Sequence, residues 1–267
     1  MNHKKLLTQV IGYTMVFLLL VACGTTQPTS TPTDTPIPEA MATPTLIPTG
    51  AETEWIYVAL GDSEPMCCGT RSYPEYYAEF IEQDLNVKVS LHNLAVSGID
   101  SEGLLRRLER ENYRDLISKA QVVTFVITMG DLLSCPQGYR ECAENKLVTA
   151  RANYTAIIEE ILTLTSTEDT IIRAQTYDNP FVNRWKEQGV LEERKPMLDR
   201  WNQQIVEVAT QYGIPVARVY QDFNGPNGDE DPGDKGYIAG DDFHNNDAGA
   251  RRMAELLREL GYEPLAP

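Results

Sequence analysis

Residues 55–63 read Trp-Ile-Tyr-Val-Ala-Leu-Gly-Asp-Ser, an apolar run that stops at a glycine and is followed by two polar residues. A short apolar run with a turn signal at its end is typical of a β-strand buried on both faces. A Ser directly after such a strand, and before a helix, can expose its hydroxyl group and receive the positive field of the helix N-terminus. Ser63 is therefore the first candidate for a reactive side chain.

The alternation of apolar strand and helix continues to the C-terminus. Strands are predicted at 55–60, 87–94, 122–127, 170–174 and 215–219. Helices are predicted between and after them, at 73–85, 102–110, 150–164, 196–211 and 247–260. Five apolar strands separated by helices predict a parallel sheet covered on both faces, which is a three-layer α/β/α sandwich with a five-stranded parallel sheet.

Reactive groups of such sheets lie on loops beyond the carboxyl ends of the strands. One such loop, 93–98, reads Asn-Leu-Ala-Val-Ser-Gly, and its Gly allows a backbone N–H to approach a ligand closely. A second polar stretch, 241–249, precedes the last helix. Of the three His residues, His3 lies in the N-terminal leader and His92 inside an apolar strand, so His244 is the candidate catalytic base. The Ser after the first strand, the Gly-containing loop and the polar stretch with His244 are each common by themselves, but finding them in this order across five predicted strands is rare.

These blocks resemble those of the SGNH (GDSL-type) hydrolases, and the resemblance extends over residues 55–267. The first block is Ala-Leu-Gly-Asp-Ser at 59–63, and the second is the loop 93–98. The last, 241–249, is similar to the family pattern D-G-F-H-P-N-D-A-G. The resemblance implies a flavodoxin-like SGNH hydrolase fold and a serine esterase that acts on a carboxylic ester without cofactor or metal. Candidate substrates are an acetylated sugar, a short acyl ester and a lysolipid.

The resemblance also implies the role of each site residue. Ser63 would attack the acyl carbonyl, and His244 would take its proton and later donate it to the leaving alcohol. Asp241 would hold the imidazole and stabilise its charged form. The backbone N–H groups of Ser63 and Gly98 would donate to the oxyanion.

The third block departs from the family pattern. Where the family has Gly-x-Asn-Asp, with the Asn side chain as a third oxyanion donor, residues 128–133 read Thr-Met-Gly-Asp-Leu-Leu. Either two residues are deleted and Asp131 corresponds to the family's Asp, or Asp131 occupies the Asn position and repels the oxyanion. Losing one donor typically costs about 2.7–4 kcal/mol of transition-state stabilisation. A non-catalytic or weakly active binding module on the same fold therefore stays an alternative. A flavodoxin-like phosphate-binding protein is disfavoured, because the chain is acidic and has no Gly-rich phosphate loop.

Residues 1–22 have the features of a secretory signal peptide, with two Lys, no acidic residue and an apolar run from 10 to 22. The run ends Leu-Val-Ala-Cys, which resembles the lipobox of bacterial lipoproteins and would make Cys23 the lipidated first residue. An uncleaved transmembrane anchor is the alternative, but the uninterrupted apolar core is short for a spanning helix. In residues 23–54 the lipidated Cys would precede a disordered linker, because 25–50 contains nine Thr and six Pro.

The chain is strongly acidic, with 23 Lys and Arg against 39 Asp and Glu. Removing residues 1–22, which contain two Lys and no acid, changes the formal charge from −16 to −18. This charge excludes nucleic acid as a partner, because phosphate backbones bind basic surfaces. It also excludes electrostatic adhesion to anionic lipid. We expect a single exported domain, 55–267, monomeric and held at the bacterial membrane or cell surface by its lipid alone.

Four Cys residues remain once Cys23 is assigned to the lipid: Cys67, Cys68, Cys135 and Cys142. An even number in an exported domain predicts two disulfides, with three pairings open. We expect the two pairs to face each other across the rim of the site and favour bridges between them, with Cys135–Cys142 as the local alternative. Metal binding is disfavoured, because adjacent Cys residues lack the spacing of metal ligands.

Two further segments are weighed and set aside. Residues 227–234 offer alternating oxygen ligands, but they lack the Gly and the Glu that an EF-hand calcium loop requires, so a solvated acidic loop is expected. Four aromatic residues are candidates for lining an acyl or sugar pocket: Tyr177, Phe181, Trp185 and Trp201. Ordinary core is the expected place for such residues, above all for Trp201.

Overall fold

The computed structural model describes residues 53–66, 68–127, 129–135 and 139–266. The predicted signal peptide, 1–22, lies outside these residues, as do Cys23 and the Thr/Pro-rich linker up to residue 52. Among the described residues, no helix has the length and apolar character that crossing a membrane requires.

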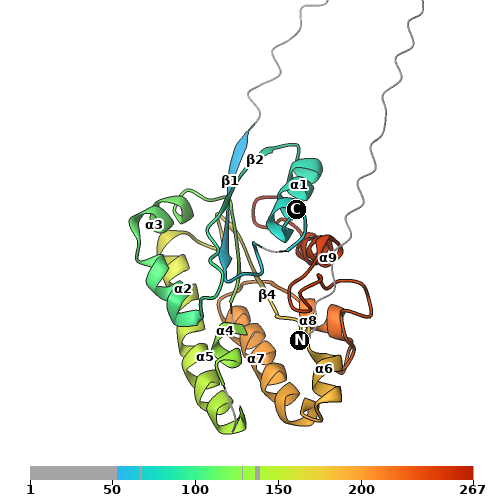
Figure 1. Cartoon of the computed structure of the whole chain (residues 1–267). Helices are drawn as coiled ribbons and strands as arrows, with labels where there is room; N and C mark the ends of the chain where they lie inside the picture. The colour runs from blue at the N-terminus through green and yellow to red at the C-terminus, as the bar shows by residue number, and fades with distance from the viewer. Residues whose placement is uncertain (1–52, 67, 128, 136–138, 267) are drawn as a thin grey trace, which may run out of the picture. The chain divides into compact units, whose positions relative to one another are not determined.

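A parallel sheet lies at the centre of the domain (Figure 1). Its five strands are β1 (Glu54–Gly61), β2 (Lys88–Asn93), β3 (Val122–Val126), β4 (Ile171–Gln175) and β5 (Val216–Ala217). Every neighbouring pair is parallel, and the order β2-β1-β3-β4-β5 is that of flavodoxin-like doubly wound sheets. The predicted five-stranded parallel sheet is confirmed.

Helices cover both faces of the sheet. The helices are α1 (Tyr73–Leu85), α2 (Ser101–Leu108), α3 (Glu111–Ile117), α4 (Met129–Leu133), α5 (Tyr139–Leu164), α6 (Val182–Glu187), α7 (Leu191–Gln211), α8 (Val219–Asn224) and α9 (Asp247–Arg258). On one side α1 contacts α9, and on the other α5 contacts α2, α3 and α7 (Figure 1). The three-layer sandwich is therefore confirmed as well.

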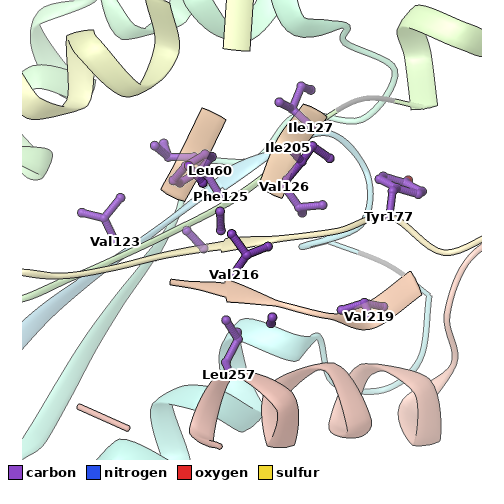
Figure 2. Packing of buried hydrophobic residues seen from close by; sticks show 14 of the residues in the cluster. Leu60, Val123, Phe125, Val126, Ile127, Tyr177, Ile205, Val216, Val219 and Leu257 are labelled. Carbon is purple, nitrogen blue, oxygen red and sulfur yellow. The ribbon is translucent and has the colours of Figure 1, made fainter. Parts of the chain in front are cut away.

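The core lies between these layers. Figure 2 shows Leu60 of β1, Phe125 of β3, Val216 of β5, Ile205 of α7 and Leu257 of α9 within one buried cluster. Burying one such side chain contributes about 1.5–3 kcal/mol relative to leaving it exposed. Because the sheet is packed on both faces, the strand ends that carry polar loops have rigid supports.

The structure adds helices that the sequence patterns did not predict, namely α3, α4, α6 and α8. Each spans only five to seven residues, too few for a helical period to emerge. The long helix α7 begins at Leu191 rather than at Pro196. The predicted start relied on the frequent occurrence of Pro in the first turn of a helix. Pro196 instead lies in the second turn, where it has no N–H to donate and the helix lacks one backbone hydrogen bond.

Trp201 of α7 is fully buried, which confirms its predicted place in the core. Its ring lies 5.9 Å from that of Tyr154, which in turn lies 5.6 Å from Phe125. We expect Trp201→Ala to lower the free energy of unfolding by about 3–5 kcal/mol, because it opens a large cavity between α5, α7 and the sheet. Denaturant unfolding followed by far-UV circular dichroism measures this, and a loss below about 1 kcal/mol would contradict the packing.

Candidate active site

Ser63, His244 and Asp241 lie together at the carboxyl end of the sheet. Ser63 follows β1 and is 8% exposed. His244 Nε2 lies 2.9 Å from Ser63 Oγ, and His244 Nδ1 lies 2.6 Å from Asp241 Oδ2. Both are hydrogen-bond distances. In this series the imidazole is placed to accept the hydroxyl proton, while the carboxylate is placed to stabilise the imidazolium.

The loop before α9 fixes the imidazole through its own backbone. Asp241 Oδ1 accepts hydrogen bonds from the N–H groups of Phe243, at 3.1 Å, and His244, at 3.0 Å. Asp242, which lies between Asp241 and Phe243, has a φ of +58°, in the left-handed region that Asp tolerates better than most residues. Partial burial opposes ionisation of Asp241, but the hydrogen bonds from the His244 ring and from these N–H groups lower its pKa overall. The carboxylate is thus held ionised beside the imidazole.

Aromatic side chains pack behind this loop. The ring of Phe243 lies 4.4 Å from the imidazole of His244 and stacks on Phe181 at 5.3 Å. Trp185 of α6 lies 5.8 Å from Phe181 in turn. Phe181, Trp185 and Tyr177 are all buried, as is expected of core residues. Phe181 and Trp185 therefore support the loop that carries His244.

The second block lies beside the first. The chain continues from β2 along β1, with Leu94 N–H donating to Ala59 O at 2.8 Å and Val96 N–H to Gly61 O at 3.0 Å. Gly98 then adopts a φ of +77°, which favours glycine. No described residue accepts a hydrogen bond from the N–H groups of Ser63 and Gly98. As far as the described residues go, these two N–H groups are candidate donors to a ligand.

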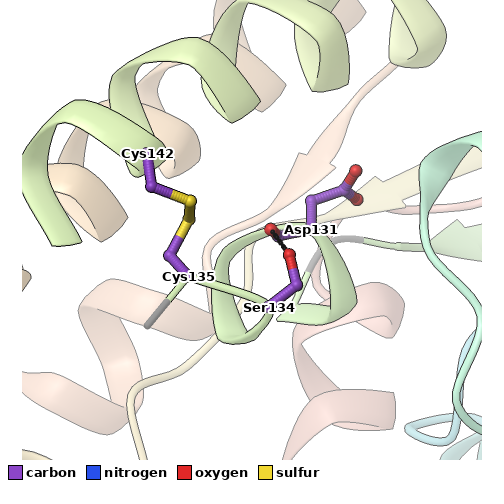
Figure 3. The surroundings of a disulfide bond; sticks show 4 residues. All are labelled: Asp131, Ser134, Cys135 and Cys142. Carbon is purple, nitrogen blue, oxygen red and sulfur yellow. Dashed lines mark hydrogen bonds between the residues drawn. A yellow bond between two sulfur atoms is a disulfide. The ribbon is translucent and has the colours of Figure 1, made fainter. Parts of the chain in front are cut away.

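Asp131, of the third block, binds the first residue of helix α2. Its buried carboxyl accepts two hydrogen bonds of 2.9 Å from Ser101, one from the backbone N–H and one from Oγ. Burial raises the pKa of Asp131, and the Ser101 hydrogen bonds oppose this rise. Its own carbonyl accepts from Ser134 Oγ (Figure 3). The Asp131 carboxyl is thus engaged by Ser101, and which of the two family positions Asp131 occupies stays a prediction.

Gly130 directly precedes this Asp, and no room exists there for a side chain. A Cβ on Gly130 would lie 2.8 Å from the carbonyl oxygen of Ile99. We expect Gly130→Ala to destabilise the fold by about 1–3 kcal/mol and to displace the loop that ends in Gly98. We also expect Gly130→Asn to lower kcat rather than restore a third donor. Thermal unfolding and ester hydrolysis test this, and a faster Gly130→Asn enzyme would contradict it.

Cys135 and Cys142 are joined to each other, with a Cα–Cα distance of 5.7 Å (Figure 3). The favoured pairing between these residues and the 67–68 loop is therefore wrong, and the local alternative is correct. The reason is the short connection from α4 to α5, which brings two positions seven residues apart to bridging distance. Cys68 is disulfide-bonded too, whereas Cys67 lies outside the described residues.

Cys68 lies beside the Asp241–His244 pair. Ligand-type atoms of these three residues lie within 4.8 Å of one another, a spacing that a metal ion tolerates. However, Asp241 and His244 bind each other, and Cys68 is bonded in a disulfide and so offers no thiolate. The cluster therefore fits a Ser–His–Asp arrangement better than a metal centre.

The acidic loop predicted around 227–234 uses its carboxylates within the fold. Asp231 is buried, and its two oxygens accept from the N–H groups of Gly233, at 2.8 Å, and Asn183, at 2.7 Å. Asp234 accepts from the Asn183 side chain at 3.2 Å. Through Asp231 and Asp234 these contacts tie the loop to α6.

Three buried polar residues next to the site were missed in the sequence: Glu64, Asp178 and Asn245. Glu64 directly follows Ser63, and Asn245 directly follows His244. The available signal was that each departs from the family pattern, Glu64 from the Leu of GDSL and Asn245 from the Pro after the His. Asp178 carried no signal, because only the fold brings it to this place.

Comparison with known proteins agrees with this geometry. The model of the GDSL-like Lipase/Acylhydrolase family matches residues 59–252. The spore germination lipase LipC of Bacillus licheniformis is 27% identical over 217 residues, which cover 77% of this chain and 96% of that protein. The structure of the lipase Lip_vut3 from a goat rumen metagenome has a TM-score of 0.68 at 25% identity, covering 79% of this chain and 99% of that one.

An acetylxylan esterase of Geobacillus stearothermophilus, Axe2, has a TM-score of 0.61 at 18% identity, covering 79% of this chain and 96% of that one. At this identity the likeness shows the fold alone. The family model, by contrast, extends over more than half of the chain and includes both the Ser63 and the His244 loops. The chain therefore belongs to the GDSL-like lipase/acylhydrolase family and is a carboxylic ester hydrolase.

Proposed function

We propose that the chain hydrolyses its ester through a covalent acyl-enzyme formed on Ser63, with His244 as the base and acid and Asp241 as the residue that orients His244. The observation that carries this proposal is the continuous series of hydrogen bonds from Ser63 Oγ to His244, at 2.9 Å, and from His244 to Asp241, at 2.6 Å. The nucleophile and its base are in reach of each other, and a third group orients the base.

In the first half of the reaction Ser63 Oγ attacks the carbonyl carbon while His244 Nε2 takes the hydroxyl proton. The oxyanion of the tetrahedral intermediate accepts hydrogen bonds from the N–H groups of Ser63 and Gly98. The C–O bond to the alcohol then breaks, and His244 donates its proton to the leaving oxygen. In the second half a water molecule, deprotonated by His244, attacks the acyl-enzyme and releases the acid and Ser63.

Two oxyanion donors rather than three limit the rate. The position before Asp131 is a glycine and has no side chain to donate. A missing donor typically reduces kcat by a factor of about 100 to 1000. We therefore expect a slow esterase, and the weakly active binding module is the second candidate function.

For the substrate we propose a short acyl ester on a hydroxyl-rich alcohol, such as an acetylated sugar. A cavity of about 450 Å³ borders the catalytic loop at Asp242, next to Asp241, although Ser63 and His244 do not line it. Its polar lining includes Asn183, Arg184, Glu187, Asp231, Asp234 and Asp242. Such a lining provides hydrogen bonds for hydroxyl groups and little apolar surface for a long acyl chain.

The test is covalent labelling with a fluorophosphonate, followed by turnover of an ester panel. We expect the label on the peptide that contains Ser63 in the wild-type chain, and no label in His244→Ala. Acetylated xylo-oligosaccharides should be hydrolysed faster than p-nitrophenyl butyrate or lysophosphatidylcholine. A label on another serine would exclude Ser63 as nucleophile, and hydrolysis of none of the esters would favour the binding module.

We further propose that the chain is exported and anchored at the bacterial membrane or cell surface through a lipid on Cys23. The basic, apolar leader and the Leu-Val-Ala-Cys sequence at 20–23 support this. In a bacterial host, Cys23→Ala should leave the membrane fraction and enter the medium, whereas Ser30→Ala should stay membrane-bound. Membrane association that persists in Cys23→Ala would exclude lipidation as the anchor.

A further inference from the structure

Two buried carboxyl groups beside the active site have no part in the ester chemistry above. Glu64 directly follows Ser63 and is 3% exposed, and Asp178 lies just beyond the end of β4 and is 2% exposed. The ion pairs of the described part of the chain include neither of them. An ionised carboxylate that is buried without a cation is costly, so their placement requires a reason.

Asn245 connects this pair to the catalytic loop. Its Nδ2 donates to Glu64 Oε1 at 2.6 Å and makes a longer contact of 3.4 Å with Asp178 Oδ1. Because Asn245 directly follows His244 and Glu64 directly follows Ser63, one buried hydrogen bond joins the two reacting segments. Nearer the surface the backbone adds a second link, with Cys68 N–H donating to Asn245 O at 3.0 Å.

Among the described residues, the titratable groups that act most strongly on the pair are acids and phenols. They lie directly after β1, at the start of α1, shortly after β4, and in the loops after α8 and before α9: Asp62, Tyr73, Tyr177, Asp231 and Asp241. Burial raises the pKa of Glu64, and the charge of Asp178 raises it further, against the opposing hydrogen bond from Asn245. Burial likewise raises the pKa of Asp178. At neutral pH the pair therefore retains a proton rather than carrying two negative charges.

We propose that the two buried carboxyl groups of Glu64 and Asp178 together carry no more than one negative charge, and that Asn245, which donates to both, uses this pair to keep His244 at hydrogen-bond distance from Ser63. Glu64 and Asn245 are then positioning residues for the esterase site, and the inference rests on the proposed roles of Ser63 and His244. When the second carboxyl group ionises, two buried carboxylates repel each other. That repulsion acts on the Glu64–Asn245 bond and hence on the Ser63–His244 distance.

The first test is the pH profile of kcat on p-nitrophenyl acetate for the full chain. The wild-type profile should fall on the alkaline side as the pair loses its proton. Glu64→Gln keeps an oxygen that accepts from Asn245 but cannot ionise, so it should retain neutral-pH activity and lose this decline. Glu64→Leu and Asn245→Ala break the bond and should each lower kcat by about 10-fold or more, with KM much less affected.

The double variant Glu64→Leu/Asn245→Ala tests whether the two residues act as one unit. Because both single changes remove the same bond, the double variant should be no slower than the slower single variant. Fully multiplicative losses in kcat would overturn the proposed link. The exposed Glu207, paired with Arg151, provides a matched control, and Glu207→Gln should keep the wild-type profile.

A second readout does not depend on activity. A carboxyl whose pKa is higher in the folded than in the unfolded chain binds its proton more tightly when folded. This contribution to stability is complete below the unfolded-chain pKa of about 4 and is lost as the pH rises through the raised folded-state pKa. The Tm of the wild type should thus fall between about pH 5 and pH 8 more steeply than that of Glu64→Gln.

The outcomes separate this inference from the proposed function. If kcat declines identically at alkaline pH in the wild type and in Glu64→Gln, and if Tm changes identically with pH in both, the proposed protonated carboxyl pair would be overturned. A wild type without Ser63-dependent hydrolysis, but with the steeper Tm slope, would overturn the esterase roles and the positioning claim while the pair itself stands. If Glu64→Gln does not fold, Asp178→Asn removes the other ionisable partner, and the same two measurements decide.

Discussion

Replacing Ser63 by Ala is expected to reduce kcat for p-nitrophenyl acetate by a factor on the order of 10⁶, because the acyl-enzyme can no longer form. This corresponds to about 8 kcal/mol of transition-state stabilisation. The fold should be nearly unaffected, since the change removes one hydroxyl group whose bond to His244 Nε2, at 2.9 Å, contributes about 1 kcal/mol. The rate of p-nitrophenyl acetate hydrolysis by the purified full-length chain measures the loss in kcat, and a thermal unfolding curve measures the change in stability.

Ser118 provides the matched control for this change. It is an exposed residue after α3 whose hydroxyl bonds only to the carbonyl of Asp115, at 2.9 Å, so Ser118→Ala should keep the wild-type rate. A loss of only a few-fold in Ser63→Ala would mean that another nucleophile carries the reaction. Loss of the folded state in Ser63→Ala would instead show that the hydroxyl has a structural role.

The position of Ser63 was predictable because parallel strands impose a simple rule. The five strands all end at the same edge of the sheet, which predicts the place of Ser63 directly after β1. His244 lies beyond α8, in the loop before α9, and was chosen because the other two His residues are in the leader and inside a strand. Asp241 was assigned through the resemblance to the SGNH hydrolases, and the structure shows that a side chain three residues before His244 needs only one turn to reach the imidazole.

Contacts that depend on the relative placement of helices were not predictable in this way. Asp131 binds Ser101 because α4 begins beside the first residue of α2, and nothing in either segment specifies that neighbour. Asp178 approaches Asn245 only through the bend of the chain after β4. The Cys135–Cys142 bond was the local alternative and not the favoured pairing, and the sequence does not show that α5 begins at Tyr139.

Asp241→Asn is expected to reduce kcat by a factor of about 10⁴ while leaving the catalytic loop folded. The two oxygens of Asp241 have different tasks, since Oδ1 accepts from the N–H groups of Phe243 and His244 and Oδ2 accepts from the imidazole. An Asn at this position can keep its oxygen on the backbone N–H groups. Its amide nitrogen then faces His244 Nδ1 as a donor, which selects the tautomer with the proton on Nε2.

That tautomer cannot accept the proton of Ser63, because the nitrogen that lies 2.9 Å from Ser63 Oγ is already protonated. The loss should therefore fall on kcat, with KM and the unfolding midpoint close to wild type. Asp241→Ala removes the backbone contacts too, so it should lower stability as well as rate. Asp229→Asn, a change at an exposed position, is the matched control and should be without effect. An Asp241→Asn enzyme within about 10-fold of the wild-type rate would mean that the carboxylate is not needed to set the tautomer, and the orienting role of Asp241 would have to be abandoned.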